Sequence, residues 1–296
     1  MTIGRVTQGM LSQRAVGGLQ TNLARLAEIQ EKLSTGRSIN RASDSPTDST
    51  AAMRLTSAVG DAKQHSRNAA DALGWLGITD TALQSVSAQL RRASDLAIQG
   101  GNAGALSADS REAIAVELEQ IRDGLIGVAN TQYLDRPVFG GITAGSAAYD
   151  ASGAFVGEAG AVNRTVGAGA QVRVDVLGPE VFGPAGDTVF DRLTALAGAL
   201  RSGDTAGVRT GMDEVKASLG RVTGALAEVG TRTNRVESAQ RRADDAVITL
   251  GSAFKDVAGV DIAATVVDLQ MQEVAYQAAL GAAARVIQPS LMDFLR

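Results

Sequence analysis

The residue types that most often carry catalysis or bind metals are scarce in this sequence, and none lies in a pattern that supports a reaction. The chain has no cysteine and one histidine, His65. Thiol chemistry, disulfide bonds and cysteine-based zinc sites are therefore excluded, and His65 has no second histidine as a co-ligand. We expect His65 to occupy an ordinary position on a helix.

Two further patterns resemble parts of active sites but lack the geometry that such sites need. Asp244 and Asp245 are adjacent, and adjacent residues on a helix do not face each other, so we expect both carboxylates to be solvated. The glycines of Gly167-Ala168-Gly169 do not stand between a strand and a helix, as those of a phosphate-binding loop do. The sequence thus predicts no enzyme activity, no bound cofactor and no metal site.

Charge and hydropathy argue against two classes of partner. The net charge is −4 and no dense group of Lys and Arg with interleaved aromatic residues is present, so we expect no nucleic-acid binding. No run of about 18 apolar residues exists, so we expect no membrane-spanning helix. Residues 1–5 lead into a polar amphipathic stretch without an apolar core, which argues against a Sec-type signal peptide.

The composition favours long helices in side-by-side contact. Hydrophobic residues make up 45% of the chain and aromatic residues only 3%, so Ala, Val, Leu and Ile must build the core. Helical periodicity covers residues 47–99, 107–130 and 188–255, whereas residues 137–187 are rich in glycine and turn signals. We predict a mainly α fold of long antiparallel helices, with terminal coiled-coil helices and a small β-rich insert that contains a hairpin at 149–155 and a half-buried strand at 172–176.

Both ends of the chain carry apolar residues at coiled-coil spacing. Near the N-terminus, Leu19, Leu26 and Leu33 are seven residues apart and Ile29 lies between the last two. Asn22 stands one heptad before Ile29, where a lone polar residue can fix the register of a seam. Near the C-terminus, spacings of four and three align an apolar row that only Glu273 interrupts; it comprises Ile262, Val266, Leu269, Tyr276, Leu280, Ala283 and Ile287.

Neither terminal segment can be safely stable as an isolated helix. The C-terminal one spans roughly 28 residues, or about 42 Å, and burial of its apolar row would contribute roughly 10–20 kcal/mol. Ordering its backbone costs about 1–2 kcal/mol per residue before helical hydrogen bonds return part of that cost. We expect the two ends to pair with each other and with neighbouring subunits; an intramolecular helical bundle is the alternative that the spacing leaves open.

Three stretches of the sequence resemble one known family, the bacterial flagellins. Residues 33–46, LSTGRSINRASDSP, resemble the flagellin N-terminal signature, with Ser45 in place of the usual second Asp and Thr47 in place of the usual Ala. Residues 261–263 and 291–296 resemble parts of the flagellin C-terminal helix, and residues 90–99 resemble a helix that contacts neighbouring subunits. Together these stretches extend the resemblance over nearly the whole chain.

Within this family the sequence resembles the branch that lies at the junction between hook and filament. Residues 129–131, Ala-Asn-Thr, lead to YLDRPVFGG at 133–141, similar to a stretch typical of that branch. Arg136-Pro137 stands where Leu-Phe is usual. The resemblance implies a structural component of the flagellum that joins hook to filament. The alternatives are flagellin itself, the bulk filament subunit, and a helical adaptor of another class.

The resemblance also implies an extracellular location and a set of partners. Such proteins pass unfolded through the flagellar type III export channel, without a cleaved signal peptide and with an export chaperone, and they assemble as a ring between a hook-side junction protein and flagellin. We divide the chain accordingly into a terminal assembly domain (1–40 with 256–296), a helical bundle (41–136 with 188–255) and a small β domain (137–187). The expected assembly interface comprises Leu19, Leu26, Ile29, Leu33, Arg92, Asp95, Ile262, Val266, Leu269, Tyr276, Leu280 and Ile287.

Overall fold

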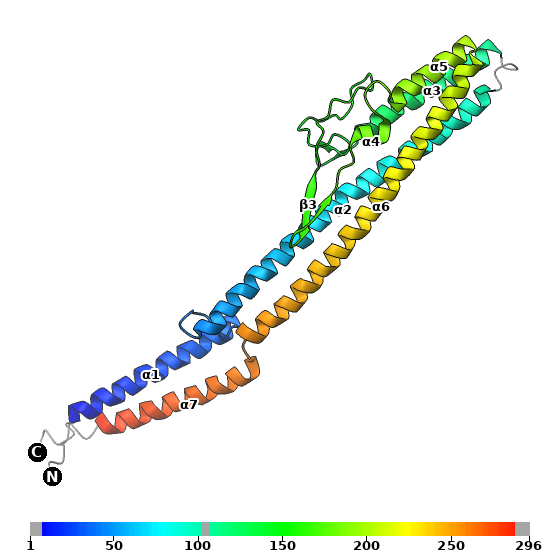
Figure 1. The fold of residues 1–296 in the computed structure, drawn as a ribbon. Coiled ribbons are helices and arrows are strands. Elements are labelled where there is room, and N and C mark those ends of the chain that lie inside the picture. Colours follow the sequence, from blue (N-terminus) through cyan, green and yellow to red (C-terminus); the bar gives the residue numbers. More distant parts are fainter. Residues whose placement is uncertain (1–7, 102–106, 288–296) are drawn as a thin grey trace, which may run out of the picture. The chain divides into compact units, whose positions relative to one another are not determined.

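The computed structural model describes residues 8–101 and 107–287, and helices dominate them (Figure 1). In chain order the elements are α1 (Gln8–Thr35), α2 (Pro46–Gly101), α3 (Ala108–Ala129), β1 (Gln132–Tyr133), β2 (Arg136–Pro137), β3 (Asn163–Gly167), β4 (Ala170–Arg173), α4 (Gly178–Phe182), α5 (Val189–Ser202), α6 (Thr205–Ala258) and α7 (Ile262–Ile287). This confirms the predicted mainly α fold with a small β-rich insert. Within the same residues, no helix has the length and apolarity that crossing a membrane requires.

The chain divides into two compact units. Unit 1 comprises Met1–Gly60 and Ala246–Arg296, and unit 2 comprises Asp61–Asp245. The terminal helices α1 and α7 belong to unit 1, whereas α3, α5 and the strands belong to unit 2; α2 and α6 contribute to both. The finer division into three domains that the sequence suggested remains a prediction.

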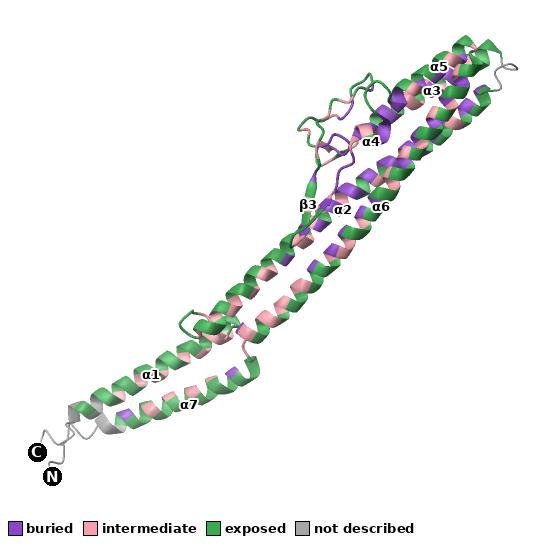
Figure 2. Cartoon of the chain, viewed as in Figure 1, coloured by how far each residue is buried: buried purple, intermediate pink, exposed green. Residues whose placement is uncertain are grey.

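Valines at seven-residue intervals line the buried side of α6 in unit 2. Five of them are at most 1% exposed: Val208, Val215, Val222, Val229 and Val236. The buried side of α2 repeats the same period with Ala69, Leu76, Leu83, Leu90 and Ala97, and both rows belong to one hydrophobic core (Figure 2). A strict seven-residue repeat favours a left-handed supercoil, because only that geometry keeps the apolar row facing its partner.

The helices α3 and α5 form a pair that packs against this core. Each of the two helices begins with a capping residue. The Ser107 hydroxyl accepts a hydrogen bond from a backbone amide of the first turn of α3, and Thr188 caps α5 in the same way. Arg201 of α5 binds two carboxylates of α3, with distances of 2.8 Å to Glu112 and 2.5 Å to Glu119. These ion pairs fix the two helices in one register.

The β-rich insert folds around a cluster of aromatic rings. Tyr149 contacts three phenylalanine rings, Phe155, Phe182 and Phe190, at centroid distances of 5.3–5.4 Å. An antiparallel bridge between Tyr149 and Phe155 forms the predicted hairpin. Val172, Val174 and Val176 are buried as the predicted alternation requires, but Asp175 between them is buried as well. The strand β4 itself ends at Arg173.

Candidate assembly surface

The terminal helices α1 and α7 pack antiparallel to each other in unit 1. The half-buried stripe of α1 contains the four predicted seam residues, Leu19, Leu26, Ile29 and Leu33. The half-buried stripe of α7 contains two predicted residues, Leu269 and Tyr276. The contact therefore brings together six residues of the expected assembly interface within a single chain.

The other residues predicted for the α7 seam lie beside this contact. Ile262, Val266 and Leu280 are 62%, 38% and 43% exposed. The inner stripe of α7 contains Thr265 and Gln272 instead, although both are polar. The side chain of Ile287 lies outside the described residues.

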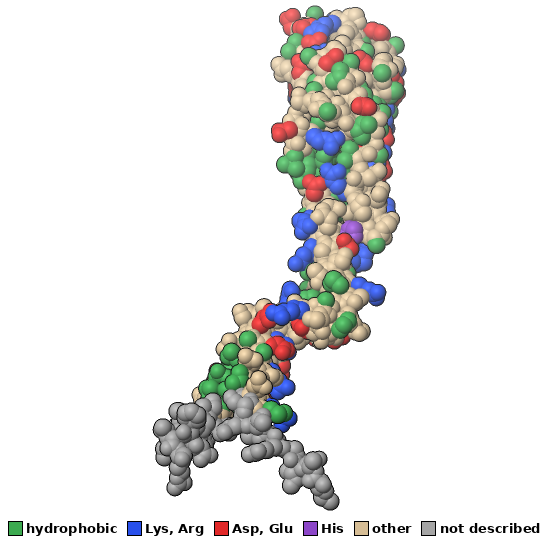
Figure 3. Space-filling model, turned by 90° about the vertical axis from the view of Figure 1, so that its left-hand side faces the viewer, with side chains coloured by type: hydrophobic (Ala, Val, Ile, Leu, Met, Phe, Trp, Pro, Cys, Tyr) green, Lys and Arg blue, Asp and Glu red, His purple; other side chains and the backbone are tan. Residues whose placement is uncertain are grey.

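A second apolar surface runs along the outside of α7. Val267, Met271 and Val274 are 54%, 61% and 66% exposed, and their spacing of four and three residues places them on one side of the helix. Figure 3 shows hydrophobic side chains exposed on unit 1 beside the terminal residues drawn in grey. We call these three residues the outer stripe.

A polar pair interrupts the contact between α1 and α7. The side-chain amide of Gln272 donates to the backbone oxygen of Asn22 at 3.2 Å and lies 3.4 Å from the Oδ1 atom of the same residue. Both residues are half-buried. A shift of one helix along the other would separate these partners, so the pair fixes the register of α1 against α7.

The end of α1 is tied directly to the start of α7. Gly36 has φ of +68°, a left-handed conformation that favours glycine, and it ends the helix. The Ser38 amide then donates to the Ala258 carbonyl at 2.9 Å, and the Val260 amide donates to the Gly36 carbonyl at 3.2 Å. The flagellin-like signature thus forms a backbone clasp between segments that are more than two hundred residues apart in the sequence.

Side chains of the same signature stabilise this clasp. The guanidinium of Arg37 lies over the ring of Phe254, 5.3 Å from its centroid, which is a cation–π distance. The Asp44 carboxylate accepts hydrogen bonds from the amides of Arg41 at 2.9 Å and Asn40 at 3.1 Å. These donors, Arg41 foremost, hold the pKa of Asp44 below its ordinary value, because they favour the charged carboxylate.

The start of α2 carries residues that are well suited to a helix N-terminus. Pro46 is its first residue, and the Asp48 amide lies 3.4 Å from the Ser45 hydroxyl, which donates to the Asp48 carboxylate at 2.7 Å. Proline is well suited to a first helical position because its missing N–H would have no helical partner there. The signature therefore ends one helix, forms the clasp and begins the next helix.

Arg92 and Asp95, the two remaining predicted interface residues, lie on α2 in unit 2. Both are exposed. Arg92 binds Glu117 of α3 within the same chain, with 2.7 Å between Nε and Oε1. A contact of Arg92 with a neighbouring subunit would therefore share or replace this ion pair.

The residue types that could carry catalysis or bind a metal do not cluster in the described part of the chain. Residues 8–101 and 107–287 hold no group of three or more His, Cys, Asp or Glu side chains arranged for a metal ion. Asp244 accepts a hydrogen bond from the hydroxyl of Ser66 at 2.7 Å, and His65 is half-buried on α2.

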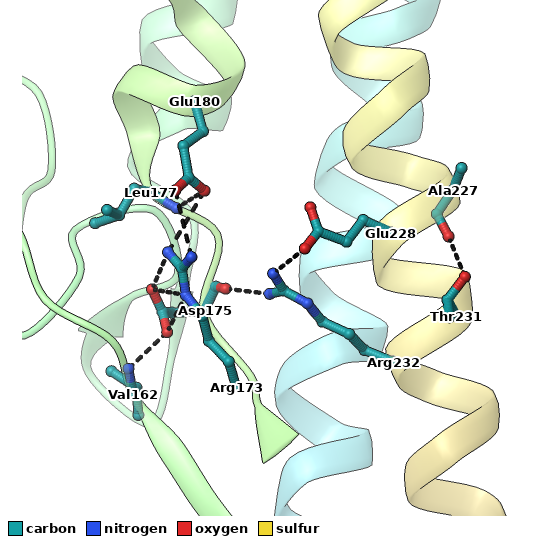
Figure 4. A network of polar contacts seen from close by, with 9 residues as sticks. All are labelled: Val162, Arg173, Asp175, Leu177, Glu180, Ala227, Glu228, Thr231 and Arg232. Atoms are coloured by element: carbon teal, nitrogen blue, oxygen red, sulfur yellow. Dashed lines mark hydrogen bonds and ion pairs between the residues drawn. The ribbon is translucent and has the colours of Figure 1, made fainter. Parts of the chain in front are cut away.

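A buried polar network, absent from the sequence-based predictions, attaches the β-rich insert to α6 (Figure 4). The Asp175 side chain is fully buried, accepts from the Val162 amide at 2.6 Å and pairs with Arg173 at 3.0 Å. The Asp175 carbonyl accepts from Nη1 of Arg232 on α6 at 2.6 Å, and Arg232 also binds Glu228. Alternation along the strand places Asp175 on the polar side, so only the long-range partners explain its burial.

Comparison with known proteins agrees with the fold and the signature. The family model for the bacterial flagellin N-terminal helical region matches residues 6–155. The flagellar hook-associated protein 3 of Escherichia coli K12 is 25% identical over 93% of this chain and 94% of its own length. Flagellin FlaB1 of Treponema pallidum is 26% identical over the full length of both chains.

A solved structure shares the same fold. The putative flagellar hook-associated protein of Vibrio parahaemolyticus superposes with a TM-score of 0.67 at 24% identity, and the match covers 73% of this chain and all of that one. The family match includes residues 33–46 and 133–141, two of the segments that carried the resemblance in the sequence. The chain therefore belongs to the bacterial flagellin family of flagellar structural proteins.

Proposed function

We propose that this chain is a structural component of the bacterial flagellum that joins the hook to the filament, and that it has no catalytic role. The observation that carries the proposal is the pairing of α1 with α7 in one fixed register, with an apolar stripe left exposed on the outside. The similarity to a hook-associated protein 3 over 93% of the chain supports the junction role in particular.

The pairing of the ends leaves apolar surface available for assembly. The side chains of the outer stripe, Val267, Met271 and Val274, are 54–66% exposed, so full burial would contribute about 1–2 kcal/mol per side chain. A modest contact repeated around a ring therefore becomes favourable. Ile262, Val266 and Leu280 offer further exposed apolar side chains beside the α1–α7 contact. The clasp and the Asn22–Gln272 pair hold the two helices in a defined geometry, which reduces the entropy that each contact must offset.

The proposed partners follow from this role. Copies of the chain form a ring, with a hook-side junction protein on one side and flagellin on the other, and an export chaperone binds the chain before secretion. Export occurs without a cleaved signal peptide, and the working location is the extracellular flagellum. The assembly interface comprises the inner seam, the exposed residues of α7 and the exposed pair Arg92 and Asp95 on α2. The terminal helices (1–40 with 256–296), the bundle (41–136 with 188–255) and the β domain (137–187) are the three proposed domains of the chain.

Flagellin is the second candidate, and the full-length similarity to flagellin FlaB1 favours it. Deletion of the gene separates the two. Loss of a junction component should leave cells with hooks and with filament subunits shed into the medium, because the subunits are exported but have no surface on which to polymerise. Filaments that still polymerise on the hook of the deletion strain would contradict the junction role.

A further inference from the structure

The turn between β1 and β2 holds a large hydrophobic residue in a conformation that disfavours it. Leu134 and Asp135 form the two-residue turn, with φ of +48° and +61°. Two-residue hairpin turns with positive φ at both positions favour Asn, Asp and Gly. Leu134 is therefore strained, and at 75% exposure it is also the most exposed large hydrophobic side chain in the described residues.

Contacts on both sides of the turn hold it against α2. The Tyr133 ring meets Trp75 edge-on at 5.7 Å, and its hydroxyl donates to Asp71 at 3.2 Å. On the other side of the turn, the Arg136 guanidinium lies 5.7 Å from the centroid of the same Trp75 ring. Backbone strain persists only where the surroundings fix the conformation, and here aromatic and polar contacts fix it. The turn is thus a rigid knob with Leu134 and Asp135 at its tip.

No contact among the described residues compensates for the exposure of this tip. Leu134 buries little of its side chain, and Asp135 is exposed and makes no ion pair or hydrogen bond with the described residues. Residues that violate local preferences without a local gain are expected at functional positions. A partner surface that fits an apolar residue followed by an acid has an apolar floor and a basic rim.

Unit 2 carries a groove of that chemistry between the β3–β4 hairpin and α6. Its volume is about 540 Å³. Val166, Val172 and Ala239 contribute apolar side chains to its lining, and Arg235 and Arg242 lie along it. These two arginines are exposed and form no ion pair or hydrogen bond with other described residues. They are seven residues apart on α6, or about 10 Å along the helix, so they offer two positions at which a carboxylate can bind.

We propose that the knob of one copy of this chain docks in the groove of a second copy, with Leu134 on the apolar floor and the Asp135 carboxylate between Arg235 and Arg242. The knob is anchored to α2 and the groove is built on α6, so the two surfaces share no residue. A contact between two different surfaces is head-to-tail, and repetition of such a contact produces a ring or a helical array. The inference rests on the proposed role as a self-assembling component, and it adds a contact outside the terminal helices.

The absence of cysteine from the sequence permits a direct test by disulfide trapping. The double variant Leu134→Cys, Ser238→Cys places one thiol on the knob and one in the groove. In flagella isolated from cells that carry only this variant, mild oxidation should give a ladder of covalent multimers on a non-reducing gel. Each single variant should give at most a dimer, and a double variant limited to the same dimer would overturn the proposal.

Antibody detection of the chain in the same flagella separates this inference from the proposed function. If the chain is present at the junction without a ladder, the head-to-tail contact is wrong and the junction role stands. If the chain is absent from the flagella, the junction role is wrong, and the oxidation is repeated on the purified full-length variant at high concentration. A ladder there supports the contact, and its absence rejects the contact as well.

Charge exchange supplies the matched control. In the double-cysteine background, Asp135→Arg should lower the yield of cross-linked multimers by roughly tenfold, because two arginines then face a third. Addition of Arg235→Asp and Arg242→Asp should restore much of the yield. Arg209→Asp, an equivalent change elsewhere on α6, should leave the yield unaltered, and circular dichroism should show unchanged helicity in every variant. If Arg209→Asp lowered the yield of cross-linked multimers as much as Asp135→Arg does, Arg235 and Arg242 would not be the residues that bind Asp135.

Discussion

Asn130 pairs with the backbone of Tyr149 as a neighbouring strand would. Its Oδ1 atom accepts from the Tyr149 amide at 2.9 Å and its Nδ2 atom donates to the Tyr149 carbonyl at 2.8 Å. The same Oδ1 atom accepts from the Ala148 amide at 2.8 Å. One side chain at the end of α3 thereby satisfies three backbone groups of the β-rich insert, and it connects the helical part of unit 2 to the aromatic cluster around Tyr149.

Replacement of Asn130 with Ala should lower the free energy of unfolding by about 2–4 kcal/mol. The change leaves partly buried backbone groups without partners, and each costs about 1–3 kcal/mol. Urea unfolding followed by circular dichroism measures the loss. Asn234→Ala is the matched control, because this exposed side chain on α6 makes no hydrogen bond among the described residues, and its effect should stay within about 0.5 kcal/mol. Equal losses in the two variants would contradict the role assigned to Asn130.

Leu134→Asn should stabilise the isolated chain while it weakens assembly. Asparagine adopts positive φ more readily than leucine, so relief of strain should raise the free energy of unfolding by about 1 kcal/mol. Ile98→Asn, at an exposed position on α2, should lower the free energy of unfolding by about 0.3 kcal/mol, because asparagine is a poorer helix former than isoleucine. Thermal unfolding of the purified chains provides the comparison. A lower melting temperature for Leu134→Asn would mean that the turn is not strained.

The clasp should respond to acid through Asp44. Backbone donors lower the folded-state pKa of this carboxyl below its ordinary value of 3.8. The stability that it contributes is therefore complete above the unfolded-state pKa and is lost as the pH falls through the lower folded-state pKa. Asp44→Asn should unfold more easily at pH 6 and should lose less further stability between pH 6 and pH 2. Parallel pH profiles of the unfolding midpoint in the two proteins would contradict this account.

Val274→Lys should abolish assembly without destabilising the monomer. Val274 is 66% exposed on the outer stripe, so its replacement should change the free energy of unfolding by no more than about 0.5 kcal/mol. A lysine in the buried contact between subunits, however, would desolvate a charge without a partner. Complementation of the deletion strain measures the effect as loss of swimming. Gln277→Lys, an exposed polar position beside the stripe, should swim normally, and normal swimming of both variants would remove the outer stripe from the interface.

The sequence predicted the helices and the seam of α1 because these features depend on local spacing. Leu19, Leu26, Ile29 and Leu33 recur at heptad intervals on a helix whose other faces are mostly polar, so only one side can be buried. Spacing alone does not identify the buried side of α7, because this helix is apolar on two sides. Periodicity aligned Ile262 and Val266 with the seam, whereas the structure exposes them and buries the stripe that contains Gln272. The partner of Gln272 is Asn22, and a residue 250 positions away in the chain cannot be identified from spacing within one helix.

The long-range polar contacts could not be predicted for the same physical reason. Asp175 alternates with buried valines and so reads as a solvent-facing residue, yet its carboxylate is enclosed by Arg173 and by the Val162 amide. Arg232 of α6 completes this network across a distance of 57 residues in the sequence. The valine heptad of α6 was visible as a pattern and would have identified the buried face of that helix. The family resemblance, by contrast, depended on contiguous signatures and was confirmed.

Immunogold labelling of intact flagella tests the junction role most directly. An antibody against this chain should label a single narrow band between hook and filament, because a junction component occupies one level of the structure. Label distributed along the whole filament would instead identify the chain as a filament subunit and contradict the account.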